Sequence, residues 1–473
     1  MTSRILGPFN RVEGDLEVHL DIDDGRVATA RVNSPLYRGF ETMLVGKSPL
    51  DALVIVPRIC GICSVAQSAA AAQALRSLMG LEAPSNGLLA ERLVTACENL
   101  ADHLSHFYLF FMPDFARPAY QHRPWFPAVA ARFQALTGSA MNEMLPARAE
   151  FMHLMGLMAG KWPHTLSLQP GGSSRPLELA EVLRLVTLLR GFRRFLETRL
   201  FGDTLENVAA LDSLEALARW RHGRTGDLAL FLDAAEDLGL DRMGRARDAF
   251  LSHGAYGLFP DGVWEEGAAA PLDPSAIRED VSHAWLAGDT RPPAQGETRP
   301  VADKPGAYTW CKAPRYAGRV METGALARQM LAGHPLIRAL VAERGGSVQA
   351  RVLARLLELA LVLPEMEVWA RQLKPGEPWC AHGDLPESGS AFGLVEAARG
   401  ALGHWLDVRQ GRIRNYQIIA PTTWNFSPRD EGGVPGALEQ ALVGLPVEPD
   451  DPMPVVVQHV VRSFDPCMVC TVH

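Results

Sequence analysis

RICGIC, residues 58–63, and DPCMVC, residues 465–470, are the two stretches that decide how this chain folds. Each contains a Cys-x-x-Cys pair, and nearly the whole chain lies between them. Two such loops brought together offer four thiolates, a set that suits zinc, iron–sulfur or nickel–iron centres. On spacing alone, zinc is the ordinary interpretation. Zinc loops usually enclose a small domain, however, whereas here the whole fold must close to build the site.

The residues around the first pair predict an activated thiol. The segment SVAQSAAAAQALRSLMG, residues 64–80, is rich in alanine and ends in glycine, which is typical of a helix with a C-terminal glycine stop. We therefore expect Cys63 at a helix N-terminus, where the dipole lowers thiol pKa values, and Arg58 as a nearby cation. Such thiolates are prepared to bind a metal.

The remaining chain predicts an α+β fold that is mainly helical, with a large helical core and small antiparallel β elements near both termini. Alternating apolar and polar residues around the turn Asp23-Asp24-Gly25 predict a β-hairpin over 16–33. β-branched runs predict short buried strands within 411–428 and 454–467. Apolar residues at three- and four-residue spacing predict long helices over 88–112, 177–200, 325–340 and 348–373.

Composition limits the class of protein. We expect the 473 residues to form a single domain, 1–473, with a Pro- and Gly-rich excursion at about 254–305. The net charge of −8 comes without a basic stripe, which disfavours nucleic-acid partners and anionic membranes. No stretch approaches the roughly 20 uninterrupted apolar residues of a spanning helix. Seven cysteines, an odd number, argue against a disulfide-stapled secreted fold, and a cytoplasmic location is predicted.

Acidic residues recur beside the cysteine motifs: Glu13 in RVEG, Glu41 in RGFE and Asp465 next to Cys467. Together with RICGIC (58–63), GKWPHTLSLQPGGSS (160–174), EAARGALGHW (396–405), NYQIIAPTTWN (415–425) and DPCMVCTVH (465–473), they run in order over nearly the full length. In this combination the chain resembles the large subunit of nickel–iron hydrogenases. Cys97, Cys311 and Cys380 lie outside any pair and are expected to be small buried hydrophobes.

The resemblance implies a dinuclear metal centre. By resemblance, the four paired cysteines bind nickel, and Cys63 and Cys470 also bridge to an iron that carries carbon monoxide and cyanide ligands. The four nickel ligands are Cys60, Cys63, Cys467 and Cys470. Soft sulfur ligation and an open coordination position suit heterolytic cleavage of dihydrogen into hydride and proton.

Several further residues match family positions around that centre. Glu13 matches the glutamate that relays the proton. Arg399 matches the arginine above the open coordination site, and Asp102 and Asp465 are the acids that would fix its guanidinium. A second set, Glu41, the backbone of Ile418 and His473, matches a magnesium site, although histidine is an unusual magnesium ligand.

Gln67 departs from the common pattern, because catalytic members usually carry histidine at that position. Glutamine cannot titrate, and its presence near the bridging Cys63 resembles the hydrogen-sensing branch of the family. Ile62 and Phe110 are bulky at positions where that branch narrows the gas channel, but ordinary core packing explains them equally well. Ala398 replaces a proline that often precedes the matching arginine.

The first prediction is therefore a low-turnover, regulatory hydrogenase subunit that cleaves dihydrogen for sensing. It passes electrons to a small subunit that holds the iron–sulfur clusters, because the scattered cysteines left here cannot hold a relay. The partners implied by the resemblance are this small subunit, in a heterodimer or a dimer of heterodimers, and a histidine kinase. Two alternatives stay open: a catalytic uptake hydrogenase, and a noncatalytic scaffold with a four-cysteine zinc site.

Overall fold

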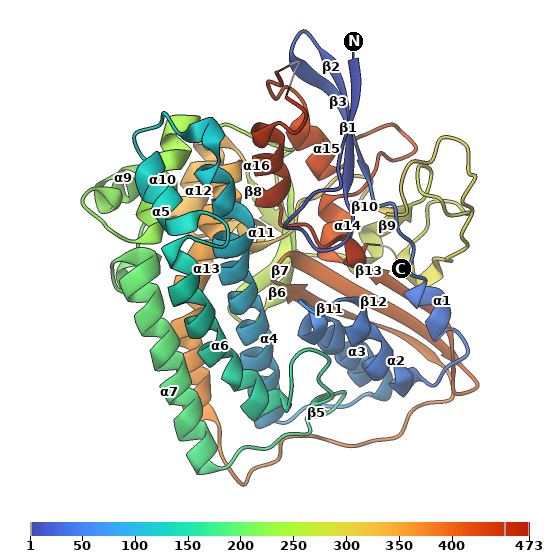
Figure 1. Ribbon diagram of the computed structural model, residues 1–473. Helices are drawn as coiled ribbons and strands as arrows, with labels where there is room; N and C mark the ends of the chain where they lie inside the picture. The colour runs from blue at the N-terminus through green and yellow to red at the C-terminus, as the bar shows by residue number, and fades with distance from the viewer. Residues whose placement is uncertain (1, 449–450, 472) are drawn as a thin grey trace.

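Helices form the body of the protein, and small antiparallel sheets are set against them (Figure 1). The computed structural model describes residues 2–448, 451–471 and 473. The helices are α1 (Phe40–Leu44), α2 (Ala52–Ile55), α3 (Ser64–Met79), α4 (Ser85–Ser105), α5 (Phe126–Phe133), α6 (Ser139–Ala159), α7 (Leu179–Phe195), α8 (Leu205–Ala209), α9 (Leu214–Arg221), α10 (Asp227–Leu238), α11 (Ala325–Ala332), α12 (Pro335–Arg344), α13 (Val348–Gln372), α14 (Pro421–Asn425), α15 (Ala437–Leu442) and α16 (Val455–Ser463).

The strands pair in short antiparallel sheets: β1–β2–β3, β4–β5, β6–β7–β8, β9–β10 and β11–β12–β13. Their bounds are β1 (Thr2–Leu6), β2 (Glu17–Asp23), β3 (Arg26–Asn33), β4 (Leu168–Gln169), β5 (Gly172–Ser173), β6 (Phe250–Ala255), β7 (Phe259–Glu265), β8 (Ala268–Ala270), β9 (Ile277–Asp280), β10 (Ala313–Tyr316), β11 (Gly389–Ala397), β12 (Gly400–Arg409) and β13 (Arg412–Ile419). The predicted mainly helical α+β class is confirmed, and β6 to β10 add strands in the middle of the chain.

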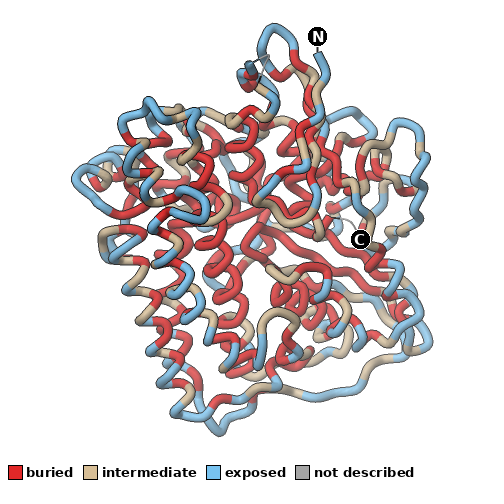
Figure 2. Tube along the Cα trace, in the orientation of Figure 1, coloured by how far each residue is buried: buried red, intermediate tan, exposed pale blue. Residues whose placement is uncertain are grey.

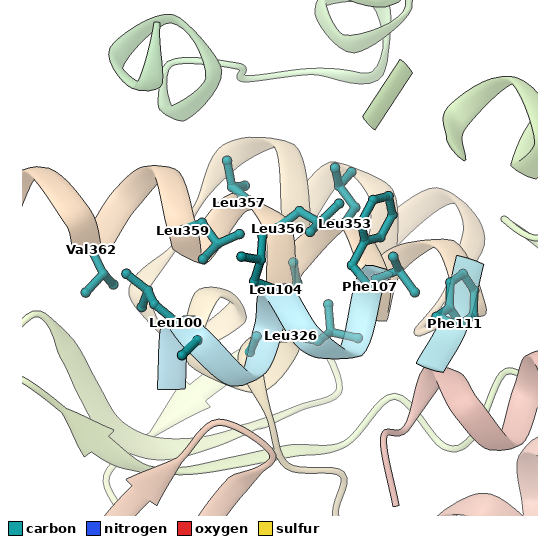
Figure 3. Close-up of a cluster of buried hydrophobic side chains, with 14 of the residues drawn as sticks. Leu100, Leu104, Phe107, Phe111, Leu326, Leu353, Leu356, Leu357, Leu359 and Val362 are labelled. Carbon is teal, nitrogen blue, oxygen red and sulfur yellow. The ribbon is translucent and has the colours of Figure 1, made fainter. Parts of the chain in front are cut away.

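Four long helices, α4, α6, α7 and α13, stand side by side on one flank of the molecule (Figure 1). Apolar residues at three- and four-residue spacing place leucines of α4 and α13 face to face, as Leu104 and Leu356 illustrate in Figure 3. Beyond α4 the helix continues as a π-helical segment, His106–Phe111, so the predicted helix over 88–112 contains a change of pitch. All four helices contribute residues to the largest cluster of buried side chains. Figure 2 shows buried segments both in this layer and in the sheets beside it.

The opposite flank is the meander β11–β12–β13, covered by α3. Gly393 allows this close approach, because a Cβ there would lie 2.1 Å from the carbonyl oxygen of Ala70 in α3. The alanine-rich sequence of α3 serves the same contact, since most of its alanines are buried against the sheet. The loops that carry the cysteine pairs end in this second core.

Three expectations about elements are corrected by the structure. Residues 454–467 contain the helix α16 in place of a strand, because Val457, Val460, Val461 and Phe464 reach the core at helical spacing. The predicted helix over 325–340 is two helices, α11 and α12, separated at Gly333, whose backbone is left-handed. Within 411–428 only β13 is a strand, and Pro421 opens the short helix α14.

Some features of the helices were not predicted, including the 21-residue α6, whose Pro146 lies inside the helix. Among the described residues, no helix combines the length and the apolar composition needed to cross a membrane.

The hairpin predicted around Asp23-Asp24-Gly25 is confirmed, and its two strands are β2 and β3.

Candidate metal centre

The four paired cysteines meet in the buried core beside α3. All four Sγ atoms lie within 4.8 Å of one another and all four residues are buried. Cys60 Sγ lies 3.4 Å from Cys467 Sγ, Cys63 Sγ lies 3.3 Å from Cys470 Sγ, and Cys467 Sγ lies 3.0 Å from Cys470 Sγ. The two ends of the chain therefore supply one compact set of four sulfur donors.

Local structure presents each pair to the other. Cys60 follows a turn of 3₁₀ helix, Val56–Ile59, and has extended backbone, while Cys63 caps the N-terminus of α3 as predicted. On the other side, Asp465 adopts a left-handed φ of 57° after α16, which turns the chain into the second pair. Cys470 closes a short 3₁₀ turn that begins at Met468.

The electrostatics of the four thiols fit a bound cation. Hydrogen bonds from Cys467, Cys470 and Cys63 lower the pKa of Cys60 well below its ordinary value. The hydrogen bond with Cys467 raises the pKa of Cys63, and burial raises that of Cys470. Protein groups alone thus favour one thiolate over four, and a soft divalent metal is what allows the whole set to ionise. Nickel and iron match this all-sulfur donor set.

One expectation about thiol activation is wrong. Among the protein groups, the thiol with the lowered pKa is Cys60 and not Cys63, because Cys63 is ringed by the other sulfurs. Arg58 is exposed and donates to the carbonyl of Val54. Arg399 is the arginine that lowers the pKa of Cys60.

Glu13 lies directly beside the second cysteine pair. Its backbone forms a parallel bridge with Cys467: the Glu13 amide donates to the Pro466 carbonyl at 3.4 Å, and the Met468 amide donates to the Glu13 carbonyl at 2.7 Å. Burial and the charge of Cys60 raise the pKa of Glu13 above its ordinary value. A half-buried carboxyl at this place can take up a proton more readily than a free one.

Arg399 sits buried between the two predicted acids. Arg399 Nη1 lies 3.0 Å from Asp102 Oδ2, and Arg399 Nη2 lies 3.1 Å from Asp465 Oδ1. Arg399 Nε also donates to the Asp465 carbonyl at 3.0 Å. The expected arrangement of these three side chains is thus present. A second arginine that the sequence did not single out, Arg355 on α13, adds an ion pair to Asp465 at 3.2 Å.

Gln67 belongs to a buried chain of polar groups that runs from α3 to β12 and β13. Its Oε1 accepts from His404 Nε2 at 2.8 Å, and His404 Nδ1 lies 2.8 Å from the Tyr416 hydroxyl. Burial lowers the pKa of His404 to about 3, so its ring is neutral at pH 7. Gln67 Nε2 is buried and has no hydrogen-bond partner among the described residues. The histidine missing at position 67 is therefore replaced by a glutamine that another histidine holds.

Glu41 and Ile418 also meet, but through the Ile418 amide, which donates to Glu41 Oε1 at 2.8 Å. The cation that contacts this carboxylate is Lys312, whose Nζ lies 3.0 Å from Glu41 Oε2, 3.4 Å from Glu279 Oε2 and 2.8 Å from Gln417 Oε1. His473 is buried, and burial and nearby Lys312 lower its pKa well below the ordinary value, so its ring is neutral. Carboxylate, amide oxygen and neutral imidazole are suitable ligands for a divalent ion.

Glu98 on α4 is a buried acid beside the first pair that no sequence motif revealed. It accepts from the amides of Val65 and Ala66 at 2.9 Å and 3.0 Å and from Trp162 Nε1 at 2.8 Å, at the N-terminus of α3. Burial raises the pKa of Glu98 to about 8. Its spacing from Asp102, one helical turn, was the available signal.

The remaining predicted residues occupy ordinary positions. Ile62 packs half-buried against the cysteine core, and Phe110 is half-buried in the π-helical segment, where its carbonyl accepts from Arg11. Ala398 is buried, and its carbonyl accepts from Arg328. Cys97 and Cys311 are buried as expected. Cys380 is only half-buried and lines a surface groove, so the expectation of burial is wrong there.

Comparison with known proteins gives one consistent result. The family model described as nickel-dependent hydrogenase matches residues 38–121 and 138–473. The periplasmic [NiFeSe] hydrogenase large subunit of Desulfomicrobium baculatum is 29% identical, with 99% of this chain and 94% of that protein covered. The uptake hydrogenase large subunit of Rubrivivax gelatinosus is 26% identical, with 99% and 95% covered. The Ni-Fe-Se hydrogenase structure from D. vulgaris Hildenborough superposes with a TM-score of 0.86 at 30% identity, and both chains are fully covered.

Proposed function

The chain belongs to the family of nickel-dependent hydrogenases, and from this premise we propose that it is the dihydrogen-oxidising large subunit of an uptake hydrogenase. The observation that carries this proposal is the set of four buried sulfurs within 4.8 Å of one another. All four positions are cysteine in this chain, so the donor set contains sulfur throughout. The iron ligands carbon monoxide and cyanide are part of the proposal.

Residues of the chain handle the proton. When bound, nickel and iron supply the chemistry that cleaves dihydrogen heterolytically. Glu13, whose backbone pairs with that of Cys467 and whose pKa is raised by burial and by the charge of Cys60, takes up the released proton at its carboxylate. The surrounding core excludes water from the thiolates, so the carboxyl is the route by which a proton leaves.

Arg399 contributes positive charge above the sulfurs. Its guanidinium is fixed by Asp102 and Asp465 in a site without solvent, where charge acts strongly because the surroundings are poorly polarisable. Arg399 therefore offers its charge from a set position and needs no reorganisation during the reaction.

Electrons leave through a partner, since hydrogenase large subunits pair with an iron–sulfur small subunit. Cys97, Cys311 and Cys380 are separate free cysteines outside the four-sulfur group, and we propose that the partner holds the clusters. We place the subunit in a heterodimer in the cytoplasm, and fractionation of cells is the test of that location.

A magnesium ion at Glu41, Ile418 and His473 is the second metal we propose. Support comes from the buried Glu41 carboxylate, an oxygen donor of the kind that magnesium prefers. Metal analysis of the protein and of Glu41→Gln distinguishes the cases: one magnesium lost in the variant supports the site, and equal magnesium contents contradict it.

Infrared spectroscopy of the chain purified with its small subunit tests the main proposal. We expect stretching bands of metal-bound carbon monoxide and cyanide, one nickel and one iron per chain, and sustained dihydrogen-dependent reduction of a dye. A preparation that contains stoichiometric zinc and lacks these bands contradicts the proposal.

Sensing of dihydrogen is the second candidate, and the observation that favours it is Gln67 held by His404. The relatives compared above carry the names of an uptake hydrogenase and of [NiFeSe] hydrogenases, so they support sensing less well than the uptake role. A sensor would have low turnover and a histidine kinase as partner. We expect Gln67→His to change the turnover of an uptake enzyme little. Sensing would be favoured if the wild type has a low turnover and the Gln67→His variant has a higher one.

A further inference from the structure

The segment from Asn10 to Gly14 is fixed on both sides of Glu13. Downstream, Gly14 has a left-handed φ of 81°, and a Cβ there would lie 2.9 Å from Val469 Cγ1. Upstream, Arg11 has a φ of 55°, which is unusual for a residue with a side chain. A backbone held in this region between two anchors has little freedom, so the anchors decide where the Glu13 carboxyl stands.

Asp114 is the upstream anchor. Its side chain is fully buried and pairs with three arginines, each from a different segment. Arg11 Nη2 and Arg117 Nη2 both contact Asp114 Oδ1, the latter at 2.8 Å, and Arg462 Nη1 contacts Oδ2. Despite burial, Arg462 and its neighbours hold the pKa of Asp114 below its ordinary value, so the carboxylate keeps its charge.

Two of these arginines lead directly to the metal centre. Arg11 lies two residues before Glu13, and its Nη1 donates to the Phe110 carbonyl at 3.2 Å. Arg462, at the end of α16, lies three residues before Asp465, and its Nη2 donates to the carbonyl and Oδ1 of Asn10 at 2.8 Å and 2.7 Å. The two chain segments that form the Glu13–Cys467 bridge are therefore both bound to the Asp114 carboxylate, one through Arg11 and the other through Arg462.

We propose that Arg11 and Arg462, gathered by Asp114, are positioning residues that set the Glu13 carboxyl against the Cys467 segment for proton transfer. The proposal rests on the hydrogenase function proposed above. Neither arginine touches a sulfur ligand in the contacts of the described residues. Their effect passes through the backbone, because a displacement of about 1 Å at a reacting group can cost on the order of a hundredfold in rate.

Arg117 provides a matched control. It contacts the same Asp114 oxygen as Arg11, and the side chains of Arg11 and Arg117 are similarly accessible, at 19% and 28%. Arg117 is not followed by a residue of the metal centre, and its remaining side-chain bond goes to Gln458, whose Oε1 also accepts from Arg462 at 3.0 Å. The contacts of Arg462 with Asp114 and Asn10 do not involve Arg117. Removing either arginine takes one cation from Asp114, but only the loss of Arg11 frees the segment before Glu13.

The test compares Arg11→Met with Arg117→Met in the complex with the small subunit. We expect Arg11→Met to slow dihydrogen–water isotope exchange by about tenfold or more, and Arg117→Met to stay within about twofold of the wild type. Infrared bands and nickel content should be unchanged in both. Amide hydrogen exchange followed by mass spectrometry should rise at Glu13 and Met468 in Arg11→Met alone.

A conservative variant keeps the test decisive if Arg11→Met does not assemble. Arg11→Lys retains a cation for Asp114 but cannot reach the Phe110 carbonyl at the same time. We therefore expect its isotope-exchange rate to lie between those of the wild type and Arg11→Met. If Arg11→Met does not assemble, we expect the exchange rate of Arg11→Lys to be lower than that of the wild type. Equal slowing in the Arg11 and Arg117 variants, or a wild-type rate and wild-type amide protection in Arg11→Lys and Arg11→Met, overturns the inference. Absence of isotope exchange in the wild type instead contradicts the proposed function.

Discussion

Asp102 and Asp465 share Arg399, yet their ionisation differs. Burial raises the pKa of Asp102 to about 7, against the opposing effect of Arg399. Burial also acts on Asp465, but Arg399 together with His106 and Arg355 outweighs it and lowers the pKa of Asp465. Asp465 is paired with two arginines and Asp102 with one, and the additional cation favours the charged form of Asp465.

Glu13→Gln is expected to slow dihydrogen–water isotope exchange by about a hundredfold or more, because the amide cannot accept and release a proton. Nickel and iron should stay bound, since Glu13 contributes backbone contacts and no sulfur ligand to the centre. The measurement is mass-spectrometric isotope exchange beside metal analysis, with exposed Asp15→Asn as the control. An unchanged exchange rate in Glu13→Gln would remove Glu13 from the proton route.

At the scale of elements, polar side chains join segments that the sequence pattern describes separately. Glu439 at the start of α15 accepts from the Val32 amide of β3 at 3.0 Å and from the Tyr308 hydroxyl at 2.8 Å. Glu98 caps α3 from the neighbouring helix α4 in a similar way. Such buried acids connect elements, but their carboxyl groups lose solvation, which opposes the charged form.

Glu439 should therefore make stability depend on pH. Burial raises its pKa to about 7 in the folded protein, above the unfolded value of 4.5. The contribution of Glu439 to the free energy of unfolding is fully present below about pH 4.5 and is lost as the pH rises through about 7. Relative to Glu439→Gln, the wild type should lose up to about 3 kcal/mol over this window. Thermal unfolding at pH 5 and pH 8 measures it, with exposed Glu343→Gln as control. A constant difference between wild type and Glu439→Gln would contradict the shift.

At the scale of the whole molecule, the metal centre joins the two ends of the chain. The core around the four sulfurs also contains residues of α1, α2, α3, β12 and β13, so closing the cysteine set closes this core. Arg462 illustrates the consequence, because its side chain is 1% exposed and lies just before the second cysteine pair. Metal binding and folding of the last segment are therefore linked.

Protein made without nickel should be cleaved by trypsin after Arg462, whereas the metal-loaded protein should resist cleavage there. Without the metal, no bond joins the sulfurs of the two cysteine pairs, so α16 and the segment that follows should open more often. Cleavage after Arg242, whose side chain is 72% exposed, is the internal control and should occur in both samples. Equal protection of Arg462 in both samples would show that the segment closes without metal.

The sequence by itself determined the class of the fold, the four sulfur ligands and the acids around them. Periodicity predicts α4, α7 and α13 because a helix that buries one face must repeat apolar residues every three or four positions. It failed over α16, where β-branched residues suggest a strand and only packing against the core decides for the helix. Arg355, Glu98, His404 and the Asp114 anchor came from the tertiary structure alone. Their roles depend on contacts between residues far apart in the chain, and a local pattern does not record which distant charge a buried side chain will meet.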